Sequence, residues 1–213
     1  MSAAKPSSFR LIATLGFSGV LSGFILVGAY LVTLPYIQAN QAKRLQQAVF
    51  RLLPGSTRMA PLVVEGNTLT PYQSKGGELP SQEAVYAGYN QQDKLVGYAI
   101  PAEGPGFADV VKILYAFDPH RRTVVGLEVL ETKETPGLGD KIIDDKEFHA
   151  SLKNLKVEPN VVLQKRGPPQ APNEVDAISG ATISSAAVVK ILNASTARWL
   201  PVFAAAAPPG AGE

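Results

Sequence analysis

The segment DAISGATISS, residues 176–185, places an acid, a glycine and four hydroxyl residues directly before a run of helical periodicity. If a helix begins near Thr182, its first N–H groups have no partner within the helix. These donors and the positive end of the helix dipole favour an anion, and a phosphate above all. Thr182 and Ser184 would place hydroxyls beside it, whereas Asp176 would repel it and is better suited to holding the turn. The alternative is an ordinary helix capped by Ser or Thr, and the motif alone leaves both open.

Two glycine-rich segments can bring the backbone close to a ligand. KETPGLGDK, residues 133–141, follows a strongly apolar run, and EGPGFAD, residues 103–109, lies between two such runs and could form another wall. Gly137 and Gly139 permit a bend that approaches a flat ligand, although a turn that ends a strand is the alternative. No segment has the Gly-Lys-Ser/Thr ending of a P-loop, or a G-x-G-x-x-G between a strand and a helix. The two common nucleotide-binding loops are therefore not indicated.

The composition excludes several kinds of function. The charges of the 20 basic and 18 acidic residues nearly cancel. Because a protein that binds nucleic acid requires a concentrated basic face, we expect no nucleic-acid partner. With no cysteine, the 213 residues cannot themselves hold an iron–sulfur cluster, a thiolate zinc site or a disulfide. His120 and His149 lack the spacing of metal ligands, and neither is an evident base for a serine triad. We expect no metal and no catalytic residue.

One segment has the length and composition of a membrane anchor. Residues 11–34, LIATLGFSGVLSGFILVGAYLVTL, contain no charge, and a helix of this length crosses a bilayer core of about 30 Å. A cleavable signal peptide has a shorter apolar core and an A-x-A-like site, which the following PYIQANQAK does not match. We predict a permanent transmembrane helix after an N-terminal tail at residues 1–10. Basic residues flank both ends, so the charges leave its orientation open.

The rest of the chain predicts an α+β domain on a stalk. Apolar residues at helical spacing predict a stalk helix and linker at residues 35–59, ended by Pro54-Gly55. Paired apolar runs interrupted by helical patterns predict an antiparallel sheet with packed helices. The predicted strands are residues 84–89, 94–100, 110–118, 123–131 and 156–166, and the predicted helices are residues 144–155 and 182–199. We assign residues 60–200 to the domain, with residues 60–83 rich in loops, and residues 201–213 to a disordered tail.

Two of these motifs are strongly specific when they occur together. ETPGLGDK at residues 134–141 precedes DAISGAT at residues 176–182, behind an N-terminal anchor. This combination resembles the covalent-FMN-binding domain family. It is most similar to the G subunits of Rnf-type ion-translocating ferredoxin oxidoreductases, to which the C subunits of sodium-translocating NADH:quinone reductases are closely related. The resemblance covers the anchor and most of residues 84–200.

The resemblance implies a cofactor and its attachment site. In that family, the final threonine of Ser-Gly-Ala-Thr carries FMN through a phosphoester bond, which a separate flavin transferase makes. The implied acceptor is Thr182, and Ser184 is the fallback. The resemblance implies a recognition motif around this acceptor, formed by Asp176, Ser179, Gly180 and Ala181. It also implies a loop that packs near the flavin ring, formed by Glu134, Thr135, Gly137, Leu138 and Gly139.

The resemblance also implies a function and a location. It implies an electron-transfer subunit rather than an enzyme on its own, because the flavin exchanges electrons with other membrane and redox subunits of a complex. It implies a single-pass anchor in the lipid of a bacterial inner membrane, with the amino terminus in the cytoplasm and the flavin domain in the periplasm. The alternatives are the flavin subunit of a different membrane reductase, and a non-redox anchored assembly or sensory domain in which DAISGAT only caps a helix.

Overall fold

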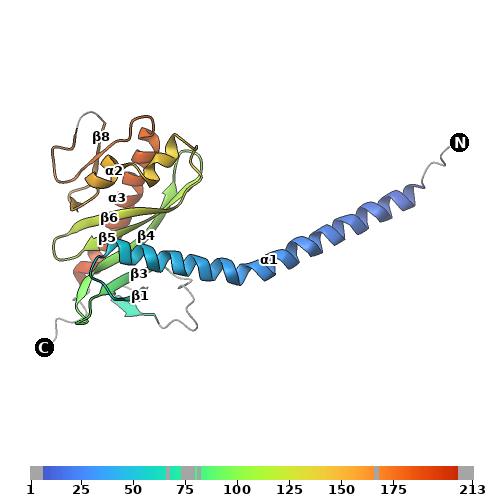
Figure 1. Cartoon of the computed structure of the whole chain (residues 1–213), viewed down its shortest axis with the longest axis horizontal. Helices are drawn as coiled ribbons and strands as arrows, with labels where there is room; N and C mark the ends of the chain where they lie inside the picture. Colours follow the sequence, from blue (N-terminus) through green and yellow to red (C-terminus); the bar gives the residue numbers. More distant parts are fainter. Residues whose placement is uncertain (1–6, 66–67, 73–79, 81–82, 166–167, 206–213) are drawn as a thin grey trace. The chain divides into compact units, whose positions relative to one another are not determined.

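The computed structural model describes residues 7–65, 68–72, 80, 83–165 and 168–205. The chain divides into two units, Met1–Lys43 and Arg44–Glu213. The helix α1, Ser8–Leu52, contributes residues to both units (Figure 1). Each unit is described by itself.

The first unit is the greater part of α1. Its large apolar side chains are exposed, among them Phe17, Phe24 and Leu31. The most apolar 18-residue window of α1 has a mean hydropathy of 2.0, and none of it is buried. A helix of this length and composition can cross a membrane. The helix continues without a break through Pro35, where we placed the border between the transmembrane helix and the stalk.

The described residues of the second unit form a seven-stranded antiparallel sheet. Its strand order is β2-β1-β3-β4-β5-β6-β7, and β8 and β9 form a separate parallel pair. The strands are β1 Arg58–Glu65, β2 Thr68–Pro71, β3 Ala84–Tyr89, β4 Leu95–Pro105, β5 Val110–Asp118, β6 Thr123–Glu131, β7 Leu155–Lys156, β8 Val162–Gln164 and β9 Glu174–Asp176.

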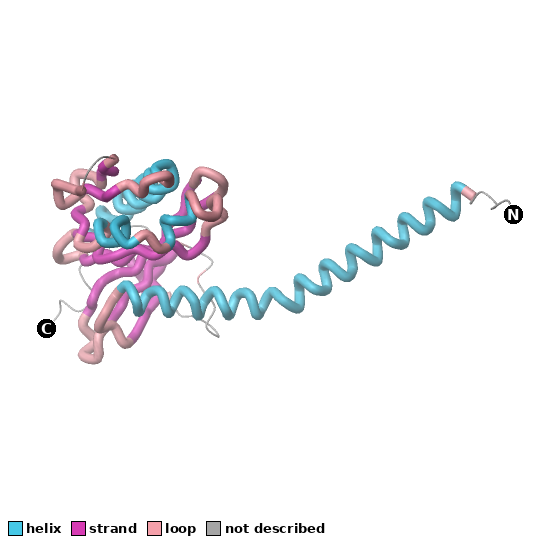
Figure 2. Tube along the Cα trace, turned by 45° about the horizontal axis from the view of Figure 1, so that its top comes forward, coloured by secondary structure: helices cyan, strands magenta, loops and turns pink. Residues whose placement is uncertain are grey.

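Helices cover both faces of this sheet. On one face, the end of α1 packs Leu45, Val49 and Leu53 against Leu114 and other buried side chains of the strands. The opposite face carries the remaining helices, and Figure 2 shows the coils of these helices grouped together beside the strands. These helices are the 3-10 helix η1 Gly139–Ile143, α2 Lys146–Ser151 and α3 Thr182–Ala205.

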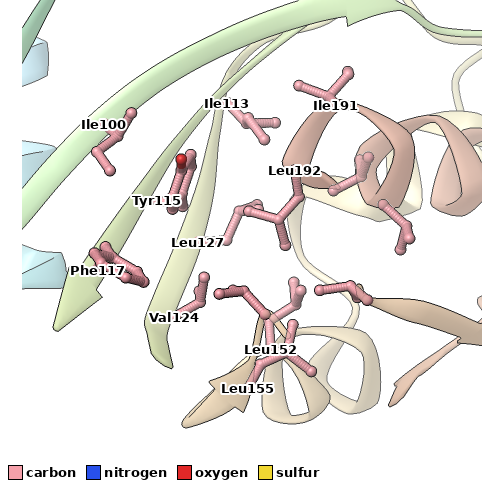
Figure 3. Close-up of a cluster of buried hydrophobic side chains, with 14 of the residues drawn as sticks. Ile100, Ile113, Tyr115, Phe117, Val124, Leu127, Leu152, Leu155, Ile191 and Leu192 are labelled. Atoms are coloured by element: carbon pink, nitrogen blue, oxygen red, sulfur yellow. The ribbon is translucent and has the colours of Figure 1, made fainter. Parts of the chain in front are cut away.

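The central strands are buried on both faces. In β5, Ile113 and Tyr115 belong to the cluster under α3, whereas Leu114 belongs to the cluster under α1, because successive side chains of a strand point to opposite faces. Figure 3 shows Ile113 and Leu127 from the sheet pointing toward Leu192 of α3. The apolar layer between the sheet and α3 is therefore the main core of the domain.

This core fixes the position of α3. Leu192 is fully buried, and Trp199 is 2% exposed. Near the end of the helix, Phe203 stacks on Tyr98 of β4 with a distance of 4.6 Å between ring centroids. Packing along the whole helix therefore sets the place of its first residue, Thr182.

The structure confirms the predicted α+β class with an antiparallel sheet. Both predicted hairpins are present, as β3–β4 and β5–β6. The prediction that residues 60–83 are rich in loops is wrong for residues 60–71, most of which lie in β1 and β2. Most of QSKGGELPS, which follows β2, lies outside the described residues.

Three predicted boundaries also differ. The strand predicted at residues 156–166 is instead the short β7 and β8 in two different sheets, because the intervening Pro159 has no N–H to donate to a ladder. The helix predicted at residues 144–155 is shorter, since α2 ends at Ser151. Residues 201–205, which we assigned to the disordered tail, are helical because α3 continues through Pro201 with Val202 in the core. The rest of that predicted tail lies outside the described residues.

Candidate functional site

A tight turn starts α3. Gly180 has a φ of 80°, a left-handed conformation that glycine adopts without steric cost. The turn is closed by a hydrogen bond of 3.0 Å from Ala181 N–H to the carbonyl of Ile178, and Ser185 N–H donates to the carbonyl of Ala181 at 2.9 Å. The N–H groups of Thr182, Ile183 and Ser184 make no hydrogen bond to any residue that the structure describes. The start of α3 therefore presents several donors in the arrangement that binds anions.

The hydroxyls at this helix start have different environments. Ser185 is fully buried and holds the turn, because its Oγ donates to the carbonyl of Ala181 at 3.0 Å and accepts from Ile178 N–H at 3.2 Å. Ser184 is 3% exposed, and its Oγ donates to Glu134 at 2.7 Å. Thr182 is half-buried, and its Oγ1 lies 3.5 Å from the carbonyl of Ile178, which is beyond the usual range for a hydroxyl donor. Thr182 thus has the least engaged hydroxyl of these three.

A cavity of about 350 Å³ opens at the start of α3. We call it the α3 pocket. It is lined by residues from three segments that are far apart in the sequence, namely Phe107, Glu134, Thr135, Leu138, Gly139, Gly180, Ala181, Thr182, Ile183 and Ser184. Of the predicted site residues, the pocket therefore gathers Thr182, its neighbours in the motif and most of the ETPGLG loop.

Three large apolar side chains around the α3 pocket are exposed. Phe107 is 65% exposed, Leu138 is 52% exposed and Ile183 is 61% exposed. They come from the loop after β4, the loop before η1 and the first turn of α3. A pocket with anion-binding donors at one side and apolar side chains at its rim suits a ligand that has both a charged and a flat apolar part.

Glu134 is the acidic residue that closes the wall of the pocket. It is 4% exposed, and its carboxylate accepts hydrogen bonds from Phe107 N–H at 2.7 Å, Ala108 N–H at 3.0 Å and Ser184 Oγ at 2.7 Å. Burial by itself raises the pKa of Glu134, but the hydrogen bonds from Ser184 and from the backbone N–H groups of residues 107–109 lower it, and the pKa lies below its ordinary value. Glu134 is therefore ionised at neutral pH.

We expect the stability contributed by Glu134 to be lost in acid. Because its folded pKa lies below the ordinary value of 4.5, folding favours the carboxylate, and the contribution is fully present above that pH. The contribution disappears as the pH falls through the lower, folded pKa. In thermal unfolding of the full-length chain in detergent, the advantage of the wild type over Glu134→Gln should shrink below about pH 4.5. The neighbouring Asp109–Lys133 pair is present in both proteins, so its titration cancels in the stability difference between wild type and Glu134→Gln. A stability difference that stays constant across the acid range would contradict this expectation.

The other predicted site residues lie apart from the α3 pocket. Asp176 and Ser179 line a second cavity, of about 980 Å³, beside α2. Gly137 lies in the ETPGLG turn with a φ of 75° and does not line the pocket. A third cavity, of about 490 Å³, is bordered by the ion pair of Glu83 with Arg198, and no predicted site residue lines it.

Comparison with known proteins connects this site to a family. Residues 106–197 match the family model of the FMN-binding domain. The G subunit of the ion-translocating oxidoreductase complex of Vibrio vulnificus is 31% identical over 180 residues, which are 82% of this chain and 80% of that protein. The chain belongs to this family of G subunits. The G subunit of the ion-translocating oxidoreductase complex of Methanosarcina acetivorans is 28% identical over 191 residues, which are 87% of this chain and 91% of that protein.

The fold of the chain is also found in a solved structure. Shewanella oneidensis NqrC superposes with a TM-score of 0.61 over 78% of this chain and 99% of that chain, at 17% sequence identity. The family resemblance inferred from ETPGLGDK and DAISGAT is thus confirmed. The FMN-binding domain of the chain includes every residue that lines the α3 pocket.

Some residues of the α3 pocket were not predicted. EGPGFAD was noted as a possible wall, but Phe107 was not selected within it. Ile183 was missed as well. It is 61% exposed in the first turn of α3, and its apolar side chain does not differ in type from the side chains that α3 buries.

Proposed function

We propose that the chain is the membrane-anchored electron-transfer subunit of an Rnf-type ion-translocating oxidoreductase complex, with FMN joined to Thr182 by a phosphoester bond. The observation that carries the proposal is the α3 pocket, where the least engaged hydroxyl of the helix start, free helix N–H groups and exposed apolar side chains meet. The names of the relatives and the FMN-binding domain support the cofactor and the complex.

The hydroxyl of Thr182 is more accessible to an incoming phosphate than that of Ser184, and this favours Thr182 as the attachment site. An esterified hydroxyl must leave its hydrogen-bond partners and accommodate a phosphate. Ser184 is buried against the Glu134 carboxylate, so a phosphate there would lie against a negative charge and break the pocket wall. A phosphate on Thr182 would instead lie beside the N–H groups at the start of α3, which stabilise negative charge.

The apolar rim of the pocket suits the isoalloxazine part of the cofactor. Phe107, Leu138 and Ile183 are more than half exposed, and a flat aromatic ring that covered them would remove apolar surface from water. A pocket of about 350 Å³ is at the small end for cofactor sites. Part of the ring would therefore stay accessible, as exchange of electrons with another subunit requires.

The protein residues would bind and position the flavin, and no residue needs to transfer a proton. When bound, FMN supplies the capacity to accept and donate electrons. The chain contains no cysteine, so the iron–sulfur centres that could exchange electrons with the flavin would be on other subunits. We therefore propose the other membrane and redox subunits of the complex as electron donor and acceptor.

We also propose that a separate flavin transferase recognises Asp176, Ser179, Gly180 and Ala181. Ser179 and Gly180 are exposed, and Asp176 and Ser179 face the cavity beside α2 rather than the α3 pocket. An enzyme could therefore contact this part of the motif from outside while Thr182 receives the flavin.

The proposal is tested on the full-length chain produced together with the transferase. Denaturing electrophoresis under ultraviolet light should show a fluorescent band at the mass of the chain. Mass spectrometry of the peptide that contains residues 167–190 should show the gain of one FMN minus one water, localised to Thr182. A chain without this mass would contradict the proposal and favour a non-redox anchored domain.

We propose that α1 is a single-pass anchor in the lipid of the inner membrane, with the amino terminus in the cytoplasm and the flavin domain in the periplasm. The length and hydropathy of α1 support the anchor, and the family resemblance supports the orientation.

The orientation can be tested with a single introduced thiol. Because the chain has no cysteine, Lys94→Cys on the exposed β3–β4 turn introduces a single thiol. A membrane-impermeant maleimide should label it in cells with a permeabilised outer membrane and an intact inner membrane. Labelling only after lysis would place the domain in the cytoplasm.

A further inference from the structure

Three separate segments of the chain meet at one carboxylate. Oε1 of Glu134 accepts from the N–H groups of Phe107 and Ala108, and Oε2 accepts from the hydroxyl of Ser184. These partners lie 27, 26 and 50 residues away in the sequence. The carboxylate therefore joins the loop after β4, the ETPGLG loop and the first turn of α3.

Two glycines allow this close approach. A Cβ at Gly139 would lie 2.5 Å from Oε2 of Glu134 and 2.7 Å from Oγ of Ser184. A Cβ at Gly106 would contact Oε1 of Glu134 and would lie 2.7 Å from the carbonyl of Asp109. These distances are shorter than any normal van der Waals contact. The backbone on both sides of the carboxylate is thus shaped to enclose it.

We propose that Glu134 is a positioning residue for the flavin site, and that its fixed negative charge makes the bound flavin harder to reduce. This inference rests on the proposed function. Glu134 holds Phe107 and the start of α3 in place around the α3 pocket through the hydrogen bonds above. It also contributes a buried negative charge to the pocket wall. A nearby negative charge opposes the addition of an electron in a site of low polarity.

The chemistry of the partners explains why an ionised group suits this place. Two of them are backbone N–H groups, which can only donate, and hydrogen bonds to an ionised acceptor are stronger than those to a neutral one. The hydrogen bonds also outweigh burial and lower the pKa of Glu134. The charge is therefore present at neutral pH.

Glutamine at this position separates charge from shape. Its carbonyl oxygen can accept from Phe107 and Ala108 as Oε1 does, and its amide can donate to Ser184, whose hydroxyl can turn and accept. Glu134→Gln therefore keeps the hydrogen bonds and removes the charge. A matched control is Glu131→Gln, three residues earlier, because Glu131 is exposed, pairs with Lys112 at 2.8 Å and does not line the pocket.

The test is a redox titration of the full-length chain in detergent, loaded with FMN by the transferase and followed by flavin absorbance. Mass spectrometry first measures the flavin content of each variant. We expect Glu134→Gln to keep its flavin and to have a more positive midpoint potential than the wild type. Glu131→Gln should shift the potential less, because water screens an exposed charge.

The outcomes distinguish this inference from the proposed function. A wild type without flavin on the 167–190 peptide overturns the proposed function. A loaded Glu134→Gln with the wild-type potential, or with the same shift as Glu131→Gln, overturns only the role of the Glu134 charge. If Glu134→Gln does not load, the flavin content of Glu134→Asp decides. Recovery with this shorter carboxylate supports a charged positioning residue, and no recovery overturns it.

Discussion

Replacing Thr182 by alanine should abolish covalent flavin and leave the domain folded. The side chain of Thr182 is half-buried, and its hydroxyl lies 3.5 Å from its nearest acceptor. Its loss should therefore change the free energy of unfolding by no more than about 0.5 kcal/mol. The fluorescent band on denaturing gels should disappear completely, because Ser184 and Ser185, the other hydroxyls in the first turn of α3, are buried and hydrogen-bonded. Mass spectrometry of the 167–190 peptide provides the quantitative measurement.

Two matched variants make this result specific. Thr182→Ser keeps a hydroxyl at the same place and should retain flavin. Ser184→Ala removes the fallback acceptor and one hydrogen bond to Glu134 and should also retain flavin on Thr182, with a small loss of stability of about 1 kcal/mol. Covalent flavin that persists in Thr182→Ala, or that vanishes in Ser184→Ala while the chain stays folded, would show that the acceptor is assigned to the wrong residue.

Gly139→Ala should disrupt the α3 pocket more than any other single-methyl change in the ETPGLG loop. The new Cβ would lie 2.5 Å from Oε2 and 2.9 Å from Cβ of Glu134. Glu134 cannot move away without lengthening its hydrogen bonds to Phe107 and Ala108. Overpacking of this kind costs about 1–3 kcal/mol, and separation of the pocket walls should reduce flavin loading markedly. Thermal unfolding and the flavin content measure the two effects.

Gly137→Ala in the same loop is the control. Gly137 has a φ of 75°, and a Cβ there would meet no described atom within 4 Å. Alanine should therefore cost about 1 kcal/mol of backbone strain, without entering the pocket. If Gly139→Ala and Gly137→Ala lost the same amount of flavin, the enclosure of Glu134 would not be what shapes the pocket.

The strands that could be predicted are those whose pattern is local. β5 and β6 are apolar on both faces and are separated by the polar turn PHRR, so their bounds were predicted directly. β1 was missed, and its Pro61 is a residue type that is rare in a central strand. The structure shows why proline is tolerated there. The residue pairs between β1 and β2 cover only Leu62–Glu65 of β1. Pro61 lies just beyond them, where its carbonyl accepts from Tyr72 N–H at 2.9 Å, so its missing N–H falls at the end of that ladder.

The site could be predicted in its motifs but not in its assembly. DAISGAT marked the start of α3, and ETPGLG marked the facing loop, since both carry glycine and hydroxyl residues in short, distinctive strings. Glu134 was expected to contact the flavin ring, and no local pattern indicates that it accepts hydrogen bonds from residues 27 and 50 positions away. Such contacts depend on the packing of the whole sheet against α3. Phe107 and Ile183 were missed for the same reason.

The firm seating of α3 in the core has a consequence for how electrons reach the flavin. A cofactor esterified to Thr182 would be attached to a residue whose position is fixed by the packing of α3. The flavin ring could then move only as far as its own ribityl chain allows. Any larger distance between redox centres would have to be closed by a neighbouring subunit that approaches the pocket, or by displacement of the complete domain.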